Sequence, residues 1–345
     1  IFAVVDVFFV SRLGPDAVAT VGLTESMLAI IYTVAMGLSI GVMATVARRI
    51  GERRPDDAAD AAVQGIALGL GLAAVIGVTG VIFAPDLLHL MGASPAVIGI
   101  GSNYTRMMLG GNGVILLLFL INAIFRGSGD AAIAMRVLWL ANGINIVLAP
   151  SLIYGVGPLP RLGVTGAAVG TTIGRGIGVL FQLWNLSRSG RRVAVRKRHL
   201  TLHPKVMLNL VRLSGAGTFQ VVVGTASWIG LVRILSTFGS YAVAGYTIGI
   251  RVILFALLPS WGLANAAATM VGQNLGAGRA DRAEEAVWTA ARYNMIFLGG
   301  VGLAFLGGAP LIAGVFTTDP VVYSFAVACL RTVSLGFLFD GAGMV

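Results

Sequence analysis

The sequence contains few charged residues and very little cysteine or histidine, and these shortages exclude several classes of protein. Only 11% of its 345 residues are charged, against roughly 25% in an ordinary soluble domain. The single cysteine, Cys329, excludes a disulfide framework and a cysteine metal site. The three histidines, His89, His199 and His203, lie in or near predicted loops and form no ligand cluster or nucleophile–base pair. We therefore expect no enzyme activity and no cofactor.

Apolar residues, in contrast, are abundant. They make up 57% of the chain, and the mean hydropathy is +0.90. Apolar runs of about 18 residues or more recur along the whole length, and each is long enough to cross the roughly 30 Å hydrocarbon layer as a helix. The 48 glycines suit close approach of membrane helices. The sequence thus predicts an all-α, polytopic membrane protein.

The chain also repeats itself in register. Turn glycines, prolines and loop charges recur 225 positions later, as in Gly14 with Gly239, Gly51 with Gly276, Arg54 with Arg279, Ala84-Pro85 with Ala309-Pro310, Pro95 with Pro320 and Arg106 with Arg331. Chance matches of such residues are rare compared with chance matches of apolar ones. We therefore predict two copies of one structural unit.

The loop residues divide the chain into about ten spans. These are predicted at residues 1–11, 19–47, 58–83, 95–125, 131–154, 164–187, 206–238, 243–272, 283–308 and from 320 onward. We assign residues 1–188 to an N-lobe, 189–205 to a basic linker and 206–345 to a C-lobe. The first and last spans look incomplete, so we expect a parent of twelve spans. Its two six-helix lobes would be related by a pseudo-two-fold axis along the membrane normal.

Basic residues follow the even-numbered spans, and the other connections carry Asp16, Asp86 and Asp319 with few basic residues. By the positive-inside rule, the basic connections are predicted to be cytoplasmic. The largest basic cluster extends from Arg188 to Lys205. Because no aromatic residues interleave with it, we expect it to lie near anionic lipid headgroups and not to bind nucleic acid.

Several polar residues occur within the predicted spans. An ionisable group in a span indicates function by default, and Asp6 lies in the apolar run from Ile1 to Val10. Burial favours the neutral form of a carboxyl group and a nearby cation favours the charged form, so Asp6 is a candidate for exchanging H⁺ or Na⁺. The alternative is an interfacial acid or a salt-bridge partner. Asn122, Asn142 and Asn145 are suited to a proton network or a small cation, or to hydrogen bonds between helices.

Other polar positions allow two interpretations. Arg175 and Arg251 either line a cavity or pair locally, and Glu25 is ambiguous near the predicted outer end of its span. The series Gly163, Gly166, Gly170 and Gly174 has a spacing of three to four residues, which predicts a close-packing helix face.

Four strings resemble the multidrug and toxic compound extrusion (MATE) family, in family order along the chain. They begin at Asp6 (DVFFVSRLGPDAVA), Phe125 (FRGSGD), Asn145 (NIVL) and Val271 (VGQNLGAG). This resemblance implies export of organic, often cationic, compounds in exchange for H⁺ or Na⁺, by alternating access between two six-helix lobes.

The resemblance also implies a coupling site in the N-lobe. The family's aspartate in the first helix falls on Asp6, its asparagines in the fourth and fifth helices fall on Asn122 and Asn145, and a threonine in the sixth falls on Thr171. Many members carry an aspartate four residues after the second asparagine, whereas this sequence has Ala149.

A second ion or substrate site is implied in the C-lobe. Asp340 resembles an aspartate that certain members use for Na⁺, and Gln220 and Arg251 are candidates to accompany it. Those members also have an acidic residue in the seventh helix, where this chain has only Gln220.

The sequence therefore predicts a cation-coupled antiporter for small organic, cationic drugs or metabolites. We expect a multi-pass monomer in the plasma membrane, in contact with lipids. One alternative is a lipid-linked oligosaccharide flippase of the same superfamily, which would need a strongly cationic cavity; Arg175, Arg233 and Arg251 keep that function open. The potential of the cavity would separate the two.

Overall fold

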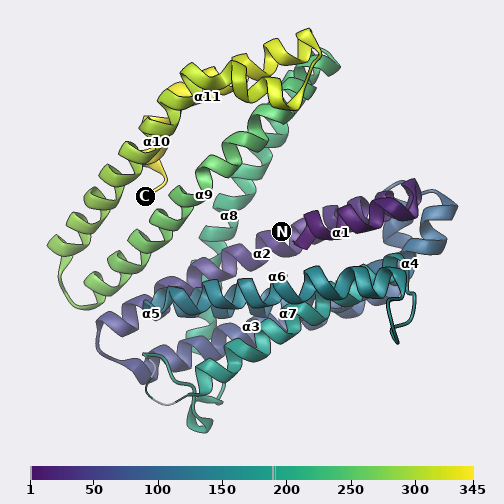
Figure 1. The fold of residues 1–345 in the computed structure, drawn as a ribbon. Coiled ribbons are helices and arrows are strands. Elements are labelled where there is room, and N and C mark those ends of the chain that lie inside the picture. The colour runs from purple at the N-terminus through teal and green to yellow at the C-terminus, as the bar shows by residue number, and fades with distance from the viewer. Residues whose placement is uncertain (1, 189, 191) are drawn as a thin grey trace. The chain divides into compact units, whose positions relative to one another are not determined.

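The computed structural model describes residues 2–188, 190 and 192–345, and these residues form helices and connections without a strand (Figure 1). The elements are α1 (Phe2–Val10), η1 (Ser11–Leu13), α2 (Pro15–Gly51), α3 (Pro55–Leu90), α4 (Pro95–Gly110), α5 (Asn112–Ser128), α6 (Ala131–Tyr154), α7 (Val164–Ser187), η2 (Lys197–His199), α8 (Pro204–Ser236), α9 (Ser240–Gly276), α10 (Ala280–Phe316) and α11 (Pro320–Gly343). Nine spans among the described residues are long and apolar enough to cross a membrane. The predicted all-α polytopic fold is confirmed.

The described chain forms two compact units that divide after Val221. The first contains α1 to α7 and the beginning of α8, and the second contains the rest of α8 with α9, α10 and α11. In the second unit, α9, α10 and α11 pack against one another around a core that includes Ile253, Leu298 and Phe337. Each unit thus has its own apolar core.

The helix boundaries reproduce the sequence repeat. α2 and α9 begin at residues 15 and 240, α3 and α10 at 55 and 280, and α4 and α11 at 95 and 320. The turns match too, since Gly14 and Gly239 have φ values of 111° and 95°. Backbone with such φ values favours glycine, which explains why both copies keep it. The two copies therefore match in their helix boundaries and turn conformation, as the matching turn residues predict.

The span predicted at residues 95–125 is divided into α4 and α5 at Gly111. Asn112 stabilises the break, because its side-chain amide donates to the carbonyl oxygens of Leu109, at 2.6 Å, and Ala73, at 3.0 Å. A carbonyl left open inside a membrane protein needs such a partner. The corresponding α11 has no break, and residue 336 lies within it.

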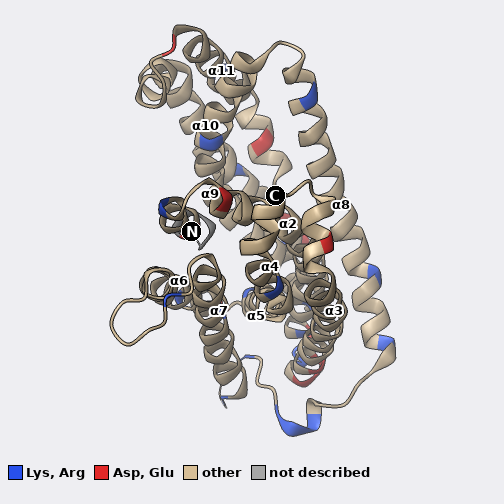
Figure 2. Ribbon diagram, turned by 90° about the vertical axis from the view of Figure 1, so that its right-hand side faces the viewer, with Lys and Arg blue, Asp and Glu red and all other residues tan. Residues whose placement is uncertain are grey.

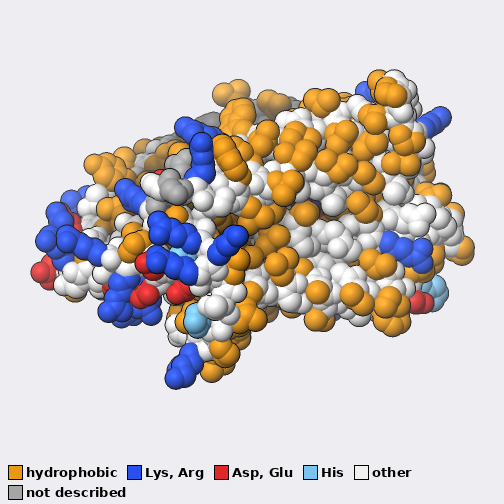
Figure 3. Space-filling model, turned by 90° about the horizontal axis from the view of Figure 1, so that it is seen from below, with side chains coloured by type: hydrophobic (Ala, Val, Ile, Leu, Met, Phe, Trp, Pro, Cys, Tyr) orange, Lys and Arg blue, Asp and Glu red, His pale blue; other side chains and the backbone are white. Residues whose placement is uncertain are grey.

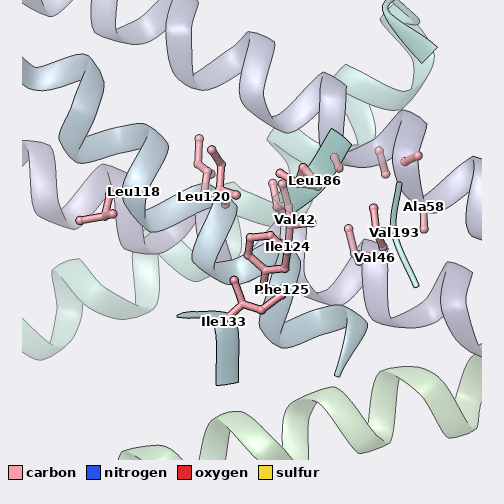
Figure 4. Packing of buried hydrophobic residues seen from close by; sticks show 14 of the residues in the cluster. Val42, Val46, Ala58, Leu118, Leu120, Ile124, Phe125, Ile133, Leu186 and Val193 are labelled. Atoms are coloured by element: carbon pink, nitrogen blue, oxygen red, sulfur yellow. The ribbon is translucent and has the colours of Figure 1, made fainter. Parts of the chain in front are cut away.

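The core of the first unit is built mainly from α2, α3, α5, α6 and α7. Figure 4 shows Val42 of α2, Ile124 and Phe125 of α5 and Leu186 of α7 meeting there. Many other large apolar side chains are exposed, including Trp139, Phe255 and Leu311, and hydrophobic side chains cover much of the face in Figure 3. Such a surface suits contact with lipid and would be a liability in water.

Lys and Arg gather in the connection between α7 and α8 (Figure 2). We call the end of the first unit formed by residues 48–57 and 192–205 the basic end. The buried Gln64 side chain holds this connection to α3: its amide donates to the Thr201 carbonyl oxygen at 2.7 Å and accepts from the His203 backbone N–H at 3.0 Å. Arg198 and His199 also contact Asp56 of α3.

A second set of charges closes the turn between α2 and α3 at the basic end. The guanidinium groups of Arg49 and Arg48 bond the Glu52 carboxylate at 2.7 and 3.2 Å. The hydrogen bond from Arg49, above all, lowers the pKa of the Glu52 carboxyl group. The basic end is thus an ordered surface and not an open tether.

Candidate functional site

Asp6 lies in α1, and the packing of α1 against α6 and α7 encloses it. The exposed fraction of Asp6 is only 1%. The Tyr154 hydroxyl of α6 donates to the Phe9 carbonyl oxygen at 2.7 Å, which holds the end of α1 against α6. The rings of these two residues also meet edge to face, 6.4 Å apart. The carboxyl group is therefore held between three helices.

Glycines on α7 allow α6 and α7 to pack closely beside Asp6. A Cβ atom added at Gly170 would lie 2.8 Å from the Ala149 Cα, and one added at Gly174 would lie 2.9 Å from the Ala141 carbonyl oxygen. Gly166 makes a similar approach to α6, whereas Gly163 precedes α7 and has a positive φ of 57°. This close contact fills the space at Ala149, where many relatives are expected to carry a second acid.

The close packing brings Asn145 of α6 and Thr171 of α7 to Asp6. The Thr171 hydroxyl donates to one carboxylate oxygen of Asp6 at 2.7 Å, and it accepts from the Asn145 amide at 2.7 Å. The same amide lies 3.5 Å from the other Asp6 oxygen. Asn145 and Thr171 are both fully buried. The structure thus brings together three of the four residues predicted for the N-lobe site.

The direction of these hydrogen bonds matches an ionised Asp6. Both neighbours donate toward its carboxylate, whereas a protonated carboxyl group would need an acceptor for its own proton. The Asn145 Oδ1 atom is buried and has no hydrogen-bond partner among the described residues. A half-turn of the Asn145 amide would exchange its donor for this acceptor. The cluster can therefore accommodate either charge state of Asp6 with little movement.

The oxygen atoms of this cluster could also ligate a small cation. Asp6 contributes two carboxylate oxygens, Thr171 a hydroxyl and Asn145, after the amide turns, a carbonyl oxygen. Hard cations prefer oxygen ligands of these kinds. The geometry is thus compatible with either H⁺ or Na⁺ at Asp6.

Further charged and phenolic groups surround the cluster. Arg175 is buried, lies one turn from Thr171 on α7 and donates to the Tyr32 hydroxyl of α2 at 3.2 Å. Asp6 and Glu25 interact electrostatically with Arg175 and with each other. Tyr104 of α4 is fully buried in the field of the same charges. Neither tyrosine could be singled out from the sequence, because an aromatic residue in an apolar run normally indicates core.

Asn122 belongs to a different polar pair. Its Oδ1 atom accepts from the fully buried Gln182 amide of α7 at 2.8 Å. Gln182 lies eleven residues beyond Thr171, which is about 16 Å along the helix. Around Gly178, between them, an added Cβ would lie within 3.5 Å of Ala141, Val137 and Leu118 side chains. An apolar layer therefore separates Asn122 from the Asp6 cluster.

The residues predicted for a second site lie on α8, α9 and α11. Arg251 of α9 and Asp340 of α11 belong to the second unit, and both are exposed. No ion pair joins them in the described part of that unit. Gln220 is also exposed and lies at the end of the first unit. Within the described second unit, Arg251 and Asp340 form no polar cluster like that at Asp6.

Comparison with known proteins identifies related chains. The MatE family model matches residues 1–151 and 219–345, which is most of the chain. The FAD transporter of Shewanella oneidensis is 29% identical over 331 residues, covering 93% of this chain and 71% of that protein. The multidrug export protein MepA of Staphylococcus haemolyticus is 22% identical over 346 residues, covering all of this chain and 75% of that protein.

Solved structures show the same fold. A crystal structure described as MATE in the bent conformation superimposes with a TM-score of 0.90 at 27% identity, covering 99% of this chain and 75% of that one. A structure described as an outward-facing multidrug resistance MATE family transporter gives a TM-score of 0.87 at 28% identity, covering 99% of this chain and 76% of that one.

Proposed function

Because the chain belongs to the MatE family, whose members are membrane transporters, we propose that it is an antiporter that exports organic, cationic compounds in exchange for H⁺ or Na⁺. Relatives named as multidrug exporters support export of drug-like compounds. None of the relatives and structures described above is named as an oligosaccharide flippase. The role of the coupling ion rests on the residues of this chain.

The observation that carries the ion-coupling proposal is the buried Asp6–Thr171–Asn145 cluster. A carboxylate with 1% exposure is costly in a membrane protein. Here its two hydrogen-bonding partners are neutral, and one of them holds an unused acceptor. A carboxyl group that alternately gains and loses a cation needs such an acceptor or ligand nearby, and Asn145 is placed to supply it.

The proposed mechanism follows from these contacts. Asp6 is ionised while the protein accepts a cationic substrate from the cytoplasm. A proton or Na⁺ then arrives from outside and neutralises Asp6, the Asn145 amide turns, and the contacts of α1 with α6 and α7 change. The Asn122–Gln182 pair holds α5 against α7 during this change. Export is driven because ion and substrate favour different conformations, which is what coupling requires.

The substitution Asp6→Asn tests this mechanism directly. It keeps the size of the side chain and removes its charge, so we expect a folded protein that has lost ion-driven efflux. The measurement is efflux of a fluorescent cation from proteoliposomes under separate pH and Na⁺ gradients, which also identifies the ion. Asp86→Asn, at an exposed acid of α3, is the matched control and should transport normally. Unchanged efflux in the Asp6 variant would remove it from the mechanism.

A second substrate class deserves a test because one relative at 29% identity is named a FAD transporter. Flavin dinucleotides are anionic, so transport of a fluorescent cation and transport of FAD, measured in the same vesicles, distinguish a cation exporter from a dinucleotide exporter. Our proposal predicts transport of the cation and none of FAD. FAD transport without cation transport would assign this chain to the second class.

We further propose that the protein is a monomer of the plasma membrane, with residues 1–188 and 206–345 as the two lobes and 189–205 as their cytoplasmic connection. The excess of Lys and Arg at the basic end supports this orientation. Single cysteines at exposed Arg53 and Asp319, in a Cys329→Ser background, should react with an impermeant thiol reagent from opposite sides of the membrane. If the cysteines at both positions reacted from the same side, this topology would be wrong.

A further inference from the structure

Glu25 of α2 is a second carboxyl group beside the Asp6 cluster. Asp6 interacts electrostatically with Arg175, and Glu25 interacts with both Arg175 and Asp6. Two acidic groups therefore share one nearby guanidinium inside the first unit. Glu25 is more accessible to solvent than Asp6, because Glu25 is half-buried whereas Asp6 is almost fully buried.

The helix register places Glu25 on the face of α2 that meets Arg175. Tyr32, whose hydroxyl accepts from Arg175 at 3.2 Å, lies seven residues after Glu25 on α2. Seven residues are about two helical turns, so the two side chains share a face of α2, about 10 Å apart along the helix. α2 and α7 both begin at the end of the unit opposite the basic end. Side chains on a helix tilt toward its N-terminus, so the Arg175 guanidinium leans from its own turn toward that of Thr171 and Asp6.

Among the described residues around Asp6, no further side chain adds a competing charge. α2 contributes Glu25 and Tyr32, α4 contributes Tyr104, α6 contributes Asn145 and Tyr154, and α7 contributes Thr171 and Arg175. Tyr32 accepts a hydrogen bond from Arg175 and fixes the guanidinium between α2 and α7. The formal charge of these groups is −1 with both acids ionised and zero after one proton is taken up.

We propose that Glu25 is the second proton-carrying group of this cluster and that Arg175 is the shared counter-ion that couples it to Asp6. This role rests on the proton-driven function proposed above. One proton from water adds to a carboxylate oxygen of either acid, and the second acid then stays ionised beside Arg175. Because Glu25 is partly exposed, it exchanges the proton with water. When Asp6 is protonated in turn, the contacts of α1 with α6 and α7 change.

The charges predict opposite effects for two substitutions. Glu25→Gln removes a negative charge, so the ionised form of Asp6 becomes easier to maintain and Asp6 should protonate at lower pH. Arg175→Gln removes the positive charge, so the cluster should protonate at higher pH. A close opposite charge commonly moves such a titration by about one pH unit or more. Arg175→Lys keeps the charge and should restore the wild-type titration.

The test is a pH titration of carboxyl protonation by difference infrared spectroscopy, on purified full-length protein in Na⁺-free lipid membranes without substrate. Subtracting Asp6→Asn spectra isolates the Asp6 band. Glu284→Gln, at an exposed acid of α10, is the control and should leave that band in place. Because no substrate is present, the titration can succeed or fail independently of export.

Shifts in opposite directions for Glu25→Gln and Arg175→Gln would support the proposal, since a purely structural role would not produce them. An Asp6 titration unchanged by Glu25→Gln would overturn it. If Arg175→Gln does not fold, the Glu25→Gln and Arg175→Lys titrations still decide the question: a shift in the first with none in the second supports the coupling, and any other pair of results contradicts it.

Discussion

At the scale of single residues, the directions of the hydrogen bonds at Asp6 indicate which charge state of its carboxyl group the neighbouring side chains stabilise. Thr171 and Asn145 both donate toward the carboxylate, at 2.7 and 3.5 Å, and the Asn145 acceptor remains unused. Neutral partners stabilise the ionised form without fixing it, as a permanent ion pair would. The site is therefore suited to a carboxyl group that changes between its ionised and neutral forms.

The Thr171 hydroxyl should be necessary for ion-driven efflux. Thr171→Val keeps the shape of the side chain and removes the donor to Asp6, and a hydrogen bond to a charged group contributes about 1.5–3 kcal/mol. We expect the initial efflux rate in proteoliposomes to fall about tenfold or more. Thr171→Ser retains the hydroxyl and should stay close to wild type. Equal rates for the Val and Ser variants would contradict this role.

The residues of the site could be predicted in part. Asp6 and Asn145 stand out because polar groups in apolar helices are rare, whereas Thr171 was indicated only by the family resemblance. The structure brings the three together. Sequence could not show that Asn122 turns to Gln182, because that depends on how α5 and α7 are rotated. It could not show Tyr32 beside Arg175 either, because an isolated tyrosine in an apolar run carries no distinguishing pattern.

At the scale of elements, glycine positions determine how closely the helices of the site approach. The α6–α7 contact at Gly170 and Gly174 leaves no room for a Cβ atom on α7. Spacing alone predicted this face. The interruption at Gly111 was not predicted, since residues 95–125 form one apolar run and the break depends on Asn112 reaching the carbonyl of Ala73 on α3.

Gly170→Ala should therefore destabilise the first unit. The added Cβ would lie 2.8 Å from the Ala149 Cα, and such overpacking typically costs about 1–3 kcal/mol. We expect a lower midpoint of thermal unfolding in detergent. Gly143→Ala is the matched control on α6, because its Cβ would meet nothing within 4 Å. Equal midpoints for the two variants would argue against close packing at Gly170.

Gln64 should hold the connection between α7 and α8 in place. Gln64→Leu removes both hydrogen bonds to Thr201 and His203, so we expect faster tryptic cleavage after Lys197 and Arg198 in the solubilised protein. Thr201→Ala keeps the backbone carbonyl that Gln64 binds and should be cleaved at the wild-type rate. A Leu variant as resistant as wild type would show that other contacts, such as those of Asp56, suffice.

At the scale of the whole molecule, the two copies share their helix boundaries but differ in their polar residues. Their helices begin at positions 225 residues apart, yet the buried carboxylate cluster occurs in the first unit, and the candidate polar residues of the second are exposed in the described chain. The repeat itself was visible in the sequence because turn residues are conserved between the copies. The difference in chemistry follows from a few side chains, and it supports our proposal that ion coupling takes place in the first unit.

The most direct test of this account is the affinity of the purified protein for a fluorescent cationic substrate, measured against pH without Na⁺ and against Na⁺ at fixed pH. Because substrate and coupling ion oppose each other at equilibrium, we predict that wild-type affinity falls as H⁺ or Na⁺ rises. The affinity of the Asp6→Asn variant should respond to neither ion. A variant that keeps the wild-type dependence would show that coupling resides elsewhere.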